Sequence, residues 1–334
     1  MNTSSPLLAA PAPPPVPSRR RWRDALLIGG LAALVLAGLA GLAAATGWEE
    51  VMHQLRDLGP MQIGALLALS LVNYLGRGLR WHLFARRLGL TTGLRQNLRH
   101  FLGGFAMSVT PARVGELIRM RWLRRETGWP VERTAPLALV DRAADLAAMA
   151  LILALALAFA ASGITFALPV AMVALLAAWV ATRPKLIVAL VTFAYRTSGR
   201  LPRSMARARG AARSLARFST LPVATGAMVL SLVGWAAEGY ALHLLLVWMG
   251  ADIGLAKAVA IFTFSTLAGG LTGAPGGLGG AEASMIALLT LEGVPLEVSV
   301  PATAIIRVTT LWFAIAIGLI VFPMAERASL KVAA

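Results

Sequence analysis

The chain has 334 residues, of which 58% are hydrophobic and only 14% are charged, and its mean hydropathy is +0.73. An ordinary water-soluble globule cannot bury so large an apolar fraction, so the composition predicts a polytopic membrane protein. The absence of cysteine excludes disulfides, thiolate nucleophiles and thiolate metal sites. A net charge of +16 raises nucleic acid as a partner, but the arginines cluster between apolar spans, where cytoplasmic retention and anionic lipid explain them. We therefore expect no nucleic-acid partner.

The amino-terminal region divides into a polar tail and a first apolar run. Residues 1–18 are rich in Pro, Ala and Ser, which predicts a disordered tail. The run from Ala25 to Ala45 is long enough to span a bilayer. A cleaved signal peptide is the alternative, because Ser18 to Arg21 resembles a twin-arginine start and Ala43 to Ala45 resembles a cleavage site. We favour a retained span because further spans follow.

Six apolar runs have about the 20 residues that a bilayer requires. Two further apolar segments, about residues 98–109 and 258–273, end at breaks rich in Pro and Gly and continue as second short arms. At about 1.5 Å per residue, the first of these reaches only ~18 Å into a hydrocarbon core of ~30 Å. Both segments are therefore predicted to be hairpins of broken helices. The six expected spans are Ala25 to Ala45, Met61 to Arg80, Ala135 to Ala160, Ile164 to Thr182, Pro222 to Met249 and Val300 to Phe322.

Loop charges indicate the side from which each hairpin enters the membrane. Both flanks of the first hairpin are rich in arginine, which places them in the cytoplasm by the positive-inside rule. Around the second hairpin, residues 250–258 contain only Lys257 among basic groups and residues 291–299 contain none, so both flanks are predicted to be external. The arginines near the first hairpin are Arg86, Arg87, Arg95, Arg99, Arg119, Arg121, Arg124, Arg125 and Arg133.

Two stretches of the chain echo each other 165 positions apart. With the opposite charge bias, this echo predicts an inverted repeat, in which residues 61–160 and 222–323 each form a span, a hairpin and a span. The hairpin tips are expected to meet near the middle of the membrane. The predicted fold class is an all-α polytopic membrane protein with six transmembrane helices and two re-entrant hairpins, in one domain over residues 19–325. Gly128, Pro130, Glu132, Pro136 and Arg142 recur as Gly293, Pro295, Glu297, Pro301 and Arg307.

Each predicted hairpin turns at residues that break helices. The first break contains Pro111 and Gly115, and the second contains a proline followed by several glycines. Broken helices free backbone amides and carbonyls that hydrocarbon cannot satisfy, so the breaks must line a hydrated cavity or be buried in protein. The residues of the second break are Pro275, Gly276, Gly277 and Gly279.

The two halves are joined by a basic connection at residues 183–221, and a short cytoplasmic tail is expected at residues 326–334. In the connection, five arginines fall on one helical arc, which predicts an amphipathic helix on the inner leaflet. A basic linker that fixes topology is an open alternative. The arginines are Arg203, Arg207, Arg209, Arg213 and Arg217, and the apolar residues facing away from them are Leu201, Met205, Leu215 and Phe218.

Eight ionisable groups lie where lipid or protein interior is expected. Exposing all of them to lipid would cost roughly 20 to 28 kcal/mol on insertion scales, so they must face one another or water. Asp141 and Asp145 share one helix face, and Arg142 is placed to pair with Asp145. The eight groups are Arg113, Glu116, Asp141, Arg142, Asp145, Glu238, Glu282 and Arg307.

The second arm of each hairpin begins near a glutamate, Glu116 or Glu282. The positive end of a helix dipole at that point favours an anion such as phosphate, and Arg113 and Arg307 are placed to add charge-assisted hydrogen bonds. Two alternatives stay open. The glutamates hold the breaks together as caps or ion-pair partners, or the intramembrane charges only pin helices to one another.

Other chemistries lack support in the sequence. No lysine follows a glycine, so there is no Walker A motif, and the four histidines lack metalloprotease spacing. We expect no cofactor, no metal and no catalytic activity. Arg77, Arg80 and Arg119 lie near the cytoplasmic boundary, where snorkelling explains them. The tryptophans expected in interfacial belts are Trp22, Trp48, Trp81, Trp122 and Trp129.

Four motifs carry a resemblance to a known family. They are Arg80-Trp81, the break from Pro111 to Glu116 with Arg119 beyond it, the stretch from Asp141 to Leu146, and the break from Pro275 to Glu282 ahead of Arg307. Together they resemble the flippase-like membrane domain of lysylphosphatidylglycerol synthases, a family that includes stand-alone relatives linked to hopanoid and glycolipid pathways. The resemblance covers about residues 20–325.

The resemblance implies movement of a lipid headgroup between leaflets. The family often has Glu-Arg where this chain has Asp141-Arg142, which leaves the charge intact. We expect no soluble aminoacyl-transferase domain like that of the full synthases, so lysyl transfer is not carried over. The family's polar break residues correspond to Arg113, Glu116, Asp141, Arg142, Asp145, Glu282 and Arg307.

We therefore expect a multi-pass lipid transporter or flippase of the inner membrane, with both termini in the cytoplasm and a charged groove for phosphate-containing headgroups. One alternative is a membrane enzyme acting on a phospholipid or polyprenyl phosphate, with Glu116 or Glu282 as general base. Another is a scaffold that recruits lipid-synthesis enzymes, and a homo-oligomer is compatible with each reading. The predicted substrate-binding residues are Arg113, Glu116, Arg119, Asp141, Arg142, Asp145, Glu238, Glu282 and Arg307.

Overall fold

The computed structural model describes residues 56–108, 110, 114–159 and 220–333, and the single positions 172, 176, 189 and 218. Regular structure within these residues is entirely helical, which confirms the all-α fold class. Several predicted features lie outside the described residues. They are the tail 1–18, the spans Ala25 to Ala45 and Ile164 to Thr182, the break residues Pro111 and Arg113, and nearly all of the connection 183–221.

The first half of the described bundle consists of two long helices with a shorter helical hairpin between them. The predicted spans from residues 61 and 135 are confirmed as helices, although the first continues eight residues beyond Arg80. The elements are α3 (Pro60–Leu88), α4 (Leu94–Gly103), the 3-10 turn η1 (Gly104–Met107), α5 (Val114–Thr127) and α6 (Val131–Phe159).

The second half repeats this order. Its last long helix contains a π-helical turn, η5 (Val308–Trp312), directly after Arg307. This turn joins two α-helical segments without a gap, so the helix runs from Leu296 into the predicted tail. The tail residues up to Ala333 are thus helical. The other elements are α10 (Leu221–Trp248), α11 (Leu255–Leu271), the 3-10 turn η4 (Pro275–Gly277), α12 (Gly280–Leu291), α13 (Leu296–Arg307) and α14 (Phe313–Ala333).

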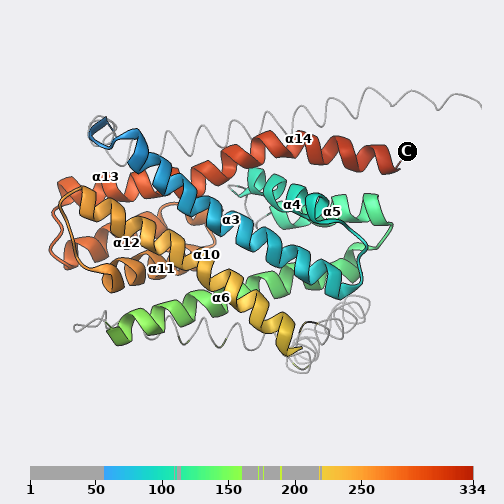
Figure 1. Cartoon of the computed structure of the whole chain (residues 1–334), viewed down its shortest axis with the longest axis horizontal. Coiled ribbons are helices and arrows are strands. Elements are labelled where there is room, and N and C mark those ends of the chain that lie inside the picture. Colours follow the sequence, from blue (N-terminus) through green and yellow to red (C-terminus); the bar gives the residue numbers. More distant parts are fainter. Residues whose placement is uncertain are drawn as a thin grey trace, which may run out of the picture.

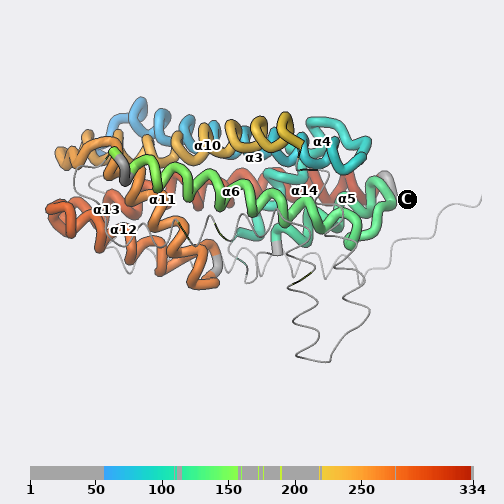
Figure 2. Tube along the Cα trace, turned by 90° about the horizontal axis from the view of Figure 1, so that it is seen from below, coloured from blue at the N-terminus to red at the C-terminus, as the bar shows by residue number. Residues whose placement is uncertain are grey.

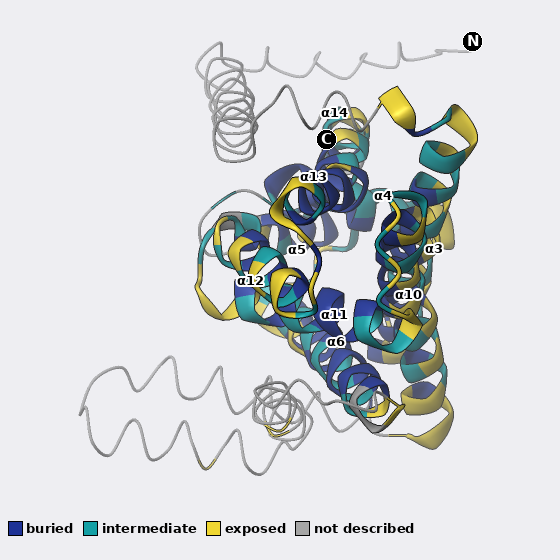
Figure 3. Cartoon of the chain, turned by 90° about the vertical axis from the view of Figure 1, so that its left-hand side faces the viewer, coloured by how far each residue is buried: buried dark blue, intermediate teal, exposed yellow. Residues whose placement is uncertain are grey.

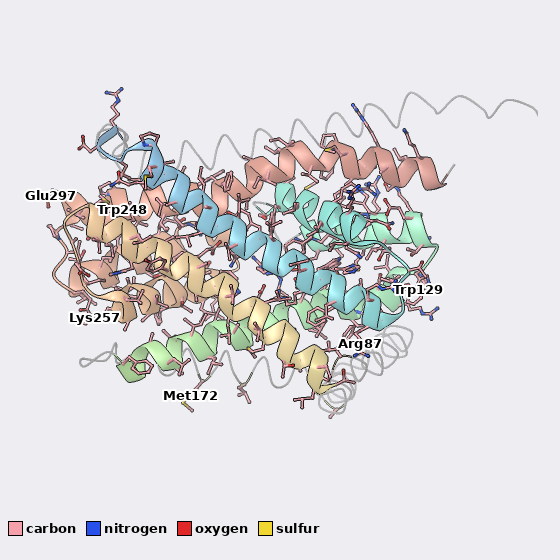
Figure 4. The ribbon with its side chains drawn as sticks, in the orientation of Figure 1. Arg87, Trp129, Met172, Trp248, Lys257 and Glu297 are labelled. Atoms are coloured by element: carbon pink, nitrogen blue, oxygen red, sulfur yellow. The ribbon has the colours of Figure 1, made fainter. Side chains whose placement is uncertain are left out.

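The two hairpins enter the bundle from opposite ends. Helices α4 and α5 lie at the end where α3 finishes and α6 begins, whereas α11 and α12 lie at the other end (Figures 1 and 2). Figure 4 shows Arg87 and Trp129 at the first end and Lys257 and Glu297 at the second. The breaks meet between the ends, because a Cβ added at Gly276 would lie 3.6 Å from the carbonyl oxygen of Ser108.

Buried residues face the inside of the bundle and exposed residues cover its outer faces (Figure 3). Many of the exposed residues are large and apolar, including Leu71, Leu75, Val229 and Val233 on α3 and α10. Two of the described helices, Leu221–Trp248 and Leu296–Lys331, are long and apolar enough to cross a bilayer. An apolar exterior around a core that contains charged side chains is the distribution expected of a protein in lipid.

Small residues let the two arms of each hairpin approach closely. In the first hairpin, a Cβ added at Gly115 would lie 2.5 Å from the carbonyl oxygen of Gly104. In the second, a Cβ added at Gly269 would lie 2.7 Å from the Cβ of Ala281. Gly104 and Gly269 are 165 positions apart, so the close approach occurs at equivalent points of the repeat. Larger side chains at these positions would force the arms apart.

Polar contacts fasten the first hairpin at its outer end. Arg99 lies 3.0 Å from Glu126, and His100 approaches the same carboxylate. Burial raises the pKa of Glu126, but hydrogen bonding to His100 and Gln96 and the charge of Arg99 outweigh burial and hold this pKa below its ordinary value. Arg125 and Trp122 on α5 donate hydrogen bonds of 2.6 and 2.7 Å to Glu326 on α14. These contacts join α4, α5 and α14.

The structure corrects two expectations about aromatic residues. Trp81 and Trp122 are fully buried, so neither belongs to an interfacial belt. Trp81 packs against Phe101, and the indole N–H of Trp122 donates a hydrogen bond to the carboxylate of Glu326. Phe218 was expected in the acyl boundary of the inner leaflet, but it is buried against α3 with its ring 5.5 Å from that of Phe84.

Candidate functional site

A cavity of about 180 Å³ lies where the two hairpin breaks meet. Space of this size holds on the order of ten water molecules. Both hairpins and each long helix that the structure describes contribute to its wall, so no single element forms the site. The residues that line it include Tyr74, Arg77, Gly104, Ser108, Gly115, Glu116, Arg119, Arg142, Trp235, Glu238, Thr266, Gly276, Gly277, Arg307 and Thr310.

Two equivalent ion pairs hold the hairpins to the long helices that follow them. Arg142 on α6 binds Glu116 in the first turn of α5. Arg307 on α13 lies 2.5 Å from Glu282 in the first turn of α12, and donates a second hydrogen bond of 2.9 Å to the carbonyl of Gly276. The two glutamates therefore serve as ion-pair partners at the breaks, as one of the open alternatives predicted.

The tip of the second hairpin depends on glycine for its backbone conformation. Gly276 and Gly277 have φ angles of 62° and 68°, in the left-handed region that side chains with a Cβ rarely adopt. Their turn directs the Gly276 carbonyl to Arg307. A freed carbonyl at the break is thus satisfied by an arginine rather than left facing hydrocarbon.

A second group of charges links α3 to α6 beside the cavity. Arg80 lies 2.6 Å from Asp141 and 2.8 Å from Asp145, and Arg77 lies 2.9 Å from Asp145. The Arg80 side chain is completely buried and also donates to Ser231 on α10. The prediction that Arg77 and Arg80 snorkel to the boundary is therefore wrong, since two aspartates on the facing helix hold them inside. The predicted pairing of Arg142 with Asp145 is present at 3.7 Å.

A four-residue echo in α3 and α10 was missed by the sequence reasoning and locates further cavity residues. Leu-Ser-Leu-Val occurs at residues 69–72 and again at 230–233. With this alignment, Tyr74 corresponds to Trp235, and both line the cavity. Tyr74 donates a hydrogen bond to the carbonyl of Thr310, and Trp235 donates one of 3.1 Å to the carboxylate of Asp145. Residues 145 and 310 are themselves 165 positions apart, so the two contacts are equivalent.

Two charged residues on the cavity wall have no ion pair or hydrogen bond with any described residue. Arg119 is only 4% exposed, and its guanidinium lies over the rings of Phe101 and Trp81, at 4.2 and 5.4 Å from their centroids. Its predicted place at the boundary is therefore wrong. Glu238 on α10 is 5% exposed, and the charged groups that act on it electrostatically belong to α3, α6 and α13. Both residues are among the predicted substrate-binding set.

The structure brings most of the predicted site residues together. Glu116, Arg119, Arg142, Glu238 and Arg307 line the cavity. Asp145 and Glu282 pair with the cavity arginines Arg77 and Arg307 from behind, whereas Asp141 pairs with Arg80, which does not line the cavity. Gly115, Gly276 and Gly277 line it at the breaks, but Gly279 is exposed. Arg113 and Pro111 lie outside the described residues, as does the side chain of Pro275.

Metal binding finds no support in the described part of the chain. No group of three or more His, Asp or Glu side chains comes close enough there to hold an ion. The carboxylates at the cavity are instead occupied by arginines, apart from Glu238. The arrangement is thus suited to recognising a polar or charged organic group by hydrogen bonds and ion pairs.

The sequence of residues 26–318 matches the model of the lysylphosphatidylglycerol synthase TM region. The chain belongs to this family. Its members are membrane proteins, and the apolar helices of the described bundle agree with that assignment. The family resemblance inferred from the break motifs and from Asp141-Arg142 is therefore confirmed.

Two curated relatives are UPF0104 membrane proteins from Methanothermobacter thermautotrophicus. One is 26% identical to this family member over 319 residues, which cover 87% of this chain and 94% of the relative. The other is 32% identical over 111 residues, which cover 33% of this chain and 32% of the relative. The first match extends across both halves of the repeat.

Proposed function

We propose that this protein is a lipid transporter that moves a polar headgroup between leaflets through the cavity at the hairpin breaks. The observation that carries the proposal is the meeting of two hairpins from opposite ends of the bundle around one charged cavity. Paired broken helices in an inverted repeat support alternating access, because rocking one half against the other opens the cavity first to one side and then to the other.

In this proposal the hairpins are re-entrant in the inner membrane. The end that carries α4 and α5 is cytoplasmic, because arginines concentrate there, and both chain termini lie on that side. The headgroup occupies the cavity and its acyl chains stay in the bilayer. Membership of the lysylphosphatidylglycerol synthase TM family supports a lipid as the transported molecule. The described site supports transport rather than catalysis, since nearly all its carboxylates are held in ion pairs.

The test is leaflet exchange of acyl-chain-labelled phospholipids in vesicles that contain the purified protein. Filling the cavity with Thr266→Trp on α11 should reduce exchange to near the rate of protein-free vesicles. The matched control is Thr225→Trp on α10, which is exposed and away from the cavity. Both threonines donate a hydrogen bond to the carbonyl four residues earlier, so the local chemical change is the same.

The unmodified protein and Thr225→Trp should exchange lipid at similar rates, well above the protein-free background. Equal rates for unmodified protein and empty vesicles across anionic, zwitterionic and glycosylated lipids would contradict transport. Unchanged exchange by a folded Thr266→Trp variant would show that the cavity is not the route.

A further inference from the structure

We propose that Arg119 and Glu238 form a two-point site for a headgroup that carries both a phosphate and a primary ammonium group. Arg119 binds the phosphate and Glu238 binds the ammonium. This inference rests on the transport proposed above, because both residues face the same cavity. It narrows the substrate class to phospholipids with a free amine, of which phosphatidylethanolamine is the simplest chemical example.

Among the residues that the structure describes, the ion pairs around the cavity leave one arginine and one glutamate of its wall without a partner. Arg77 and Arg80 are balanced by Asp141 and Asp145. Arg142 on α6 and Arg307 on α13 are each balanced by one hairpin glutamate. In the described part of the chain, only Arg119 and Glu238 line the cavity without an ion pair. An ionised group that is nearly buried requires a partner, and a ligand with both charges supplies one to each residue.

Arg119 is positioned as a phosphate donor. Aromatic rings cover one side of its guanidinium, and its Nε has no hydrogen-bond acceptor among the described residues. The rings hold the cation by its face but accept no strong hydrogen bond, so the terminal N–H groups, unlike the enclosed Nε, are left for a ligand. Gly104 makes room for it, because a Cβ there would lie 2.3 Å from Nε. A planar guanidinium with free N–H groups matches two phosphate oxygens.

Glu238 is positioned as an ammonium acceptor. The charged groups that act on it electrostatically are Arg77, Arg307 and Asp145. Arg77 is already bound to Asp145, and Arg307 to Glu282 and Gly276, so neither arginine neutralises Glu238 directly. A carboxylate accepts hydrogen bonds but donates none when ionised. A primary ammonium with three N–H donors is therefore a better partner than a quaternary amine.

Comparison of the two halves of the repeat distinguishes Arg119 and Glu238 from the charged residues of the hairpin ion pairs. The hairpin ion pairs occur in both halves, at equivalent positions. Glu238 instead occupies the position equivalent to Arg77, and Thr310 stands where the partner of Arg77, Asp145, stands in the first half. With Glu116 aligned on Glu282, the position equivalent to Arg119 in α12 is the buried apolar residue Met285. Both unpaired charges thus mark places where the halves differ, which gives the cavity opposite charges on different elements.

The experiment compares three acyl-chain-labelled lipids in vesicles that contain the protein. They are phosphatidylethanolamine, its N-acetylated form, in which an uncharged amide replaces the ammonium, and phosphatidylglycerol. Phosphatidylethanolamine should exchange roughly tenfold or more faster than the N-acetylated lipid, the ratio expected from one charge-assisted hydrogen bond. Glu238→Gln should abolish this preference and leave phosphatidylglycerol exchange in place. Arg119→Gln should slow all three lipids, since each carries a phosphate.

Matched controls make the same chemical changes outside the cavity. Arg124→Gln lies on the exposed face of α5, and Glu297→Gln lies at the exposed start of α13. Both should keep the rates and the preference of the unmodified protein. The charge-conserving variants Arg119→Lys and Glu238→Asp provide a second set in case a neutral variant does not fold, and both should keep part of the preference. Size-exclusion profiles and thermal unfolding confirm that each variant is folded.

The outcomes separate this inference from the transport that it assumes. Exchange of all three lipids at equal rates, or an equal loss for all three in Glu238→Gln, would overturn the two-point site and leave transport standing. Exchange of no lipid above protein-free vesicles would overturn transport. Uptake of soluble phosphoethanolamine by the same vesicles then tests whether the site binds a soluble compound instead of a lipid headgroup. Uptake that Glu238→Gln abolishes would keep the two-point chemistry and assign it to a soluble compound, whereas no uptake would overturn the site too.

Discussion

Arg80 shows how a charged side chain is stabilised inside this bundle. Its side chain is fully buried, its guanidinium contacts two aspartates on α6, and it donates to Ser231 on α10. Buried charges are tolerated only when such partners replace the water that they lose. In the other half, the positions equivalent to Arg80 and Asp141 are Ala241 and Ile306, which are both buried and apolar. The ion pair is therefore not required by the fold itself.

Arg80→Ala should destabilise the protein strongly, by about 3 to 5 kcal/mol, because it leaves Asp141 buried without a counter-charge. Replacing both partners, as in Arg80→Met with Asp141→Leu, should cost much less than the sum of the two single changes. Unfolding of the purified variants in detergent, measured as a double-mutant cycle, checks this. Additive single effects would contradict the pairing seen between α3 and α6.

At the scale of elements, close packing of backbones sets the position of the hairpin tips. Gly318 on α14 faces η1 so closely that an added Cβ would lie 2.2 Å from the backbone nitrogen of Ala106. The neighbour is main chain and cannot turn away as a flexible side chain does. The first hairpin tip and α14 therefore keep their spacing only with glycine at this position.

Gly318→Ala should destabilise the protein by roughly 1 to 3 kcal/mol, the usual cost of overpacking. Gly64→Ala is the matched control, because Gly64 lies in α3 with no atom within 4 Å of an added Cβ. Alanine there should stabilise the helix by about 0.5 to 1 kcal/mol, since glycine loses more backbone entropy on folding. Thermal unfolding of the two variants checks the contrast, and shifts of the same sign would contradict it.

For the whole molecule, the main consequence of the architecture is that the two hairpins point in opposite directions. The equivalent contacts of Glu116 with Arg142 and of Glu282 with Arg307 show that the two halves share one internal plan. The two ends of the bundle differ in charge, with arginine-rich segments around α4 and α5 and few basic residues around α11 and α12. Opposite insertion of the halves predicts that these ends face different compartments.

Single cysteines test this orientation cleanly because the chain has none of its own. Glu297→Cys should react with a membrane-impermeant maleimide added outside right-side-out vesicles, whereas Arg124→Cys should react only after permeabilisation. Both positions are exposed, so burial does not mask either thiol. Labelling of both cysteines from the same side would contradict the inverted arrangement.

Sequence reasoning was most successful for features that repeat or that cost energy in lipid. The helix pairs, the two breaks and the charged residues near them were predicted because apolar length, proline and glycine punctuation and buried charge each have a local signature. It failed for Arg77, Arg80 and Arg119, which were placed at the membrane boundary. Their distance from the helix ends is compatible with snorkelling, and only the facing aspartates or aromatic rings keep them inside.

The sequence by itself determined a helical membrane protein built from two related halves, because hydropathy and an echo over 165 positions are properties of the chain. Only the tertiary structure decided which charges are paired. Arg307 and Glu282, which are 25 residues apart, form an ion pair, whereas Arg119 and Glu238 have no ion pair or hydrogen bond with any residue that the structure describes. The reason is geometric: pairing depends on which helix faces come within hydrogen-bond distance, and that is set by the packing of the whole bundle.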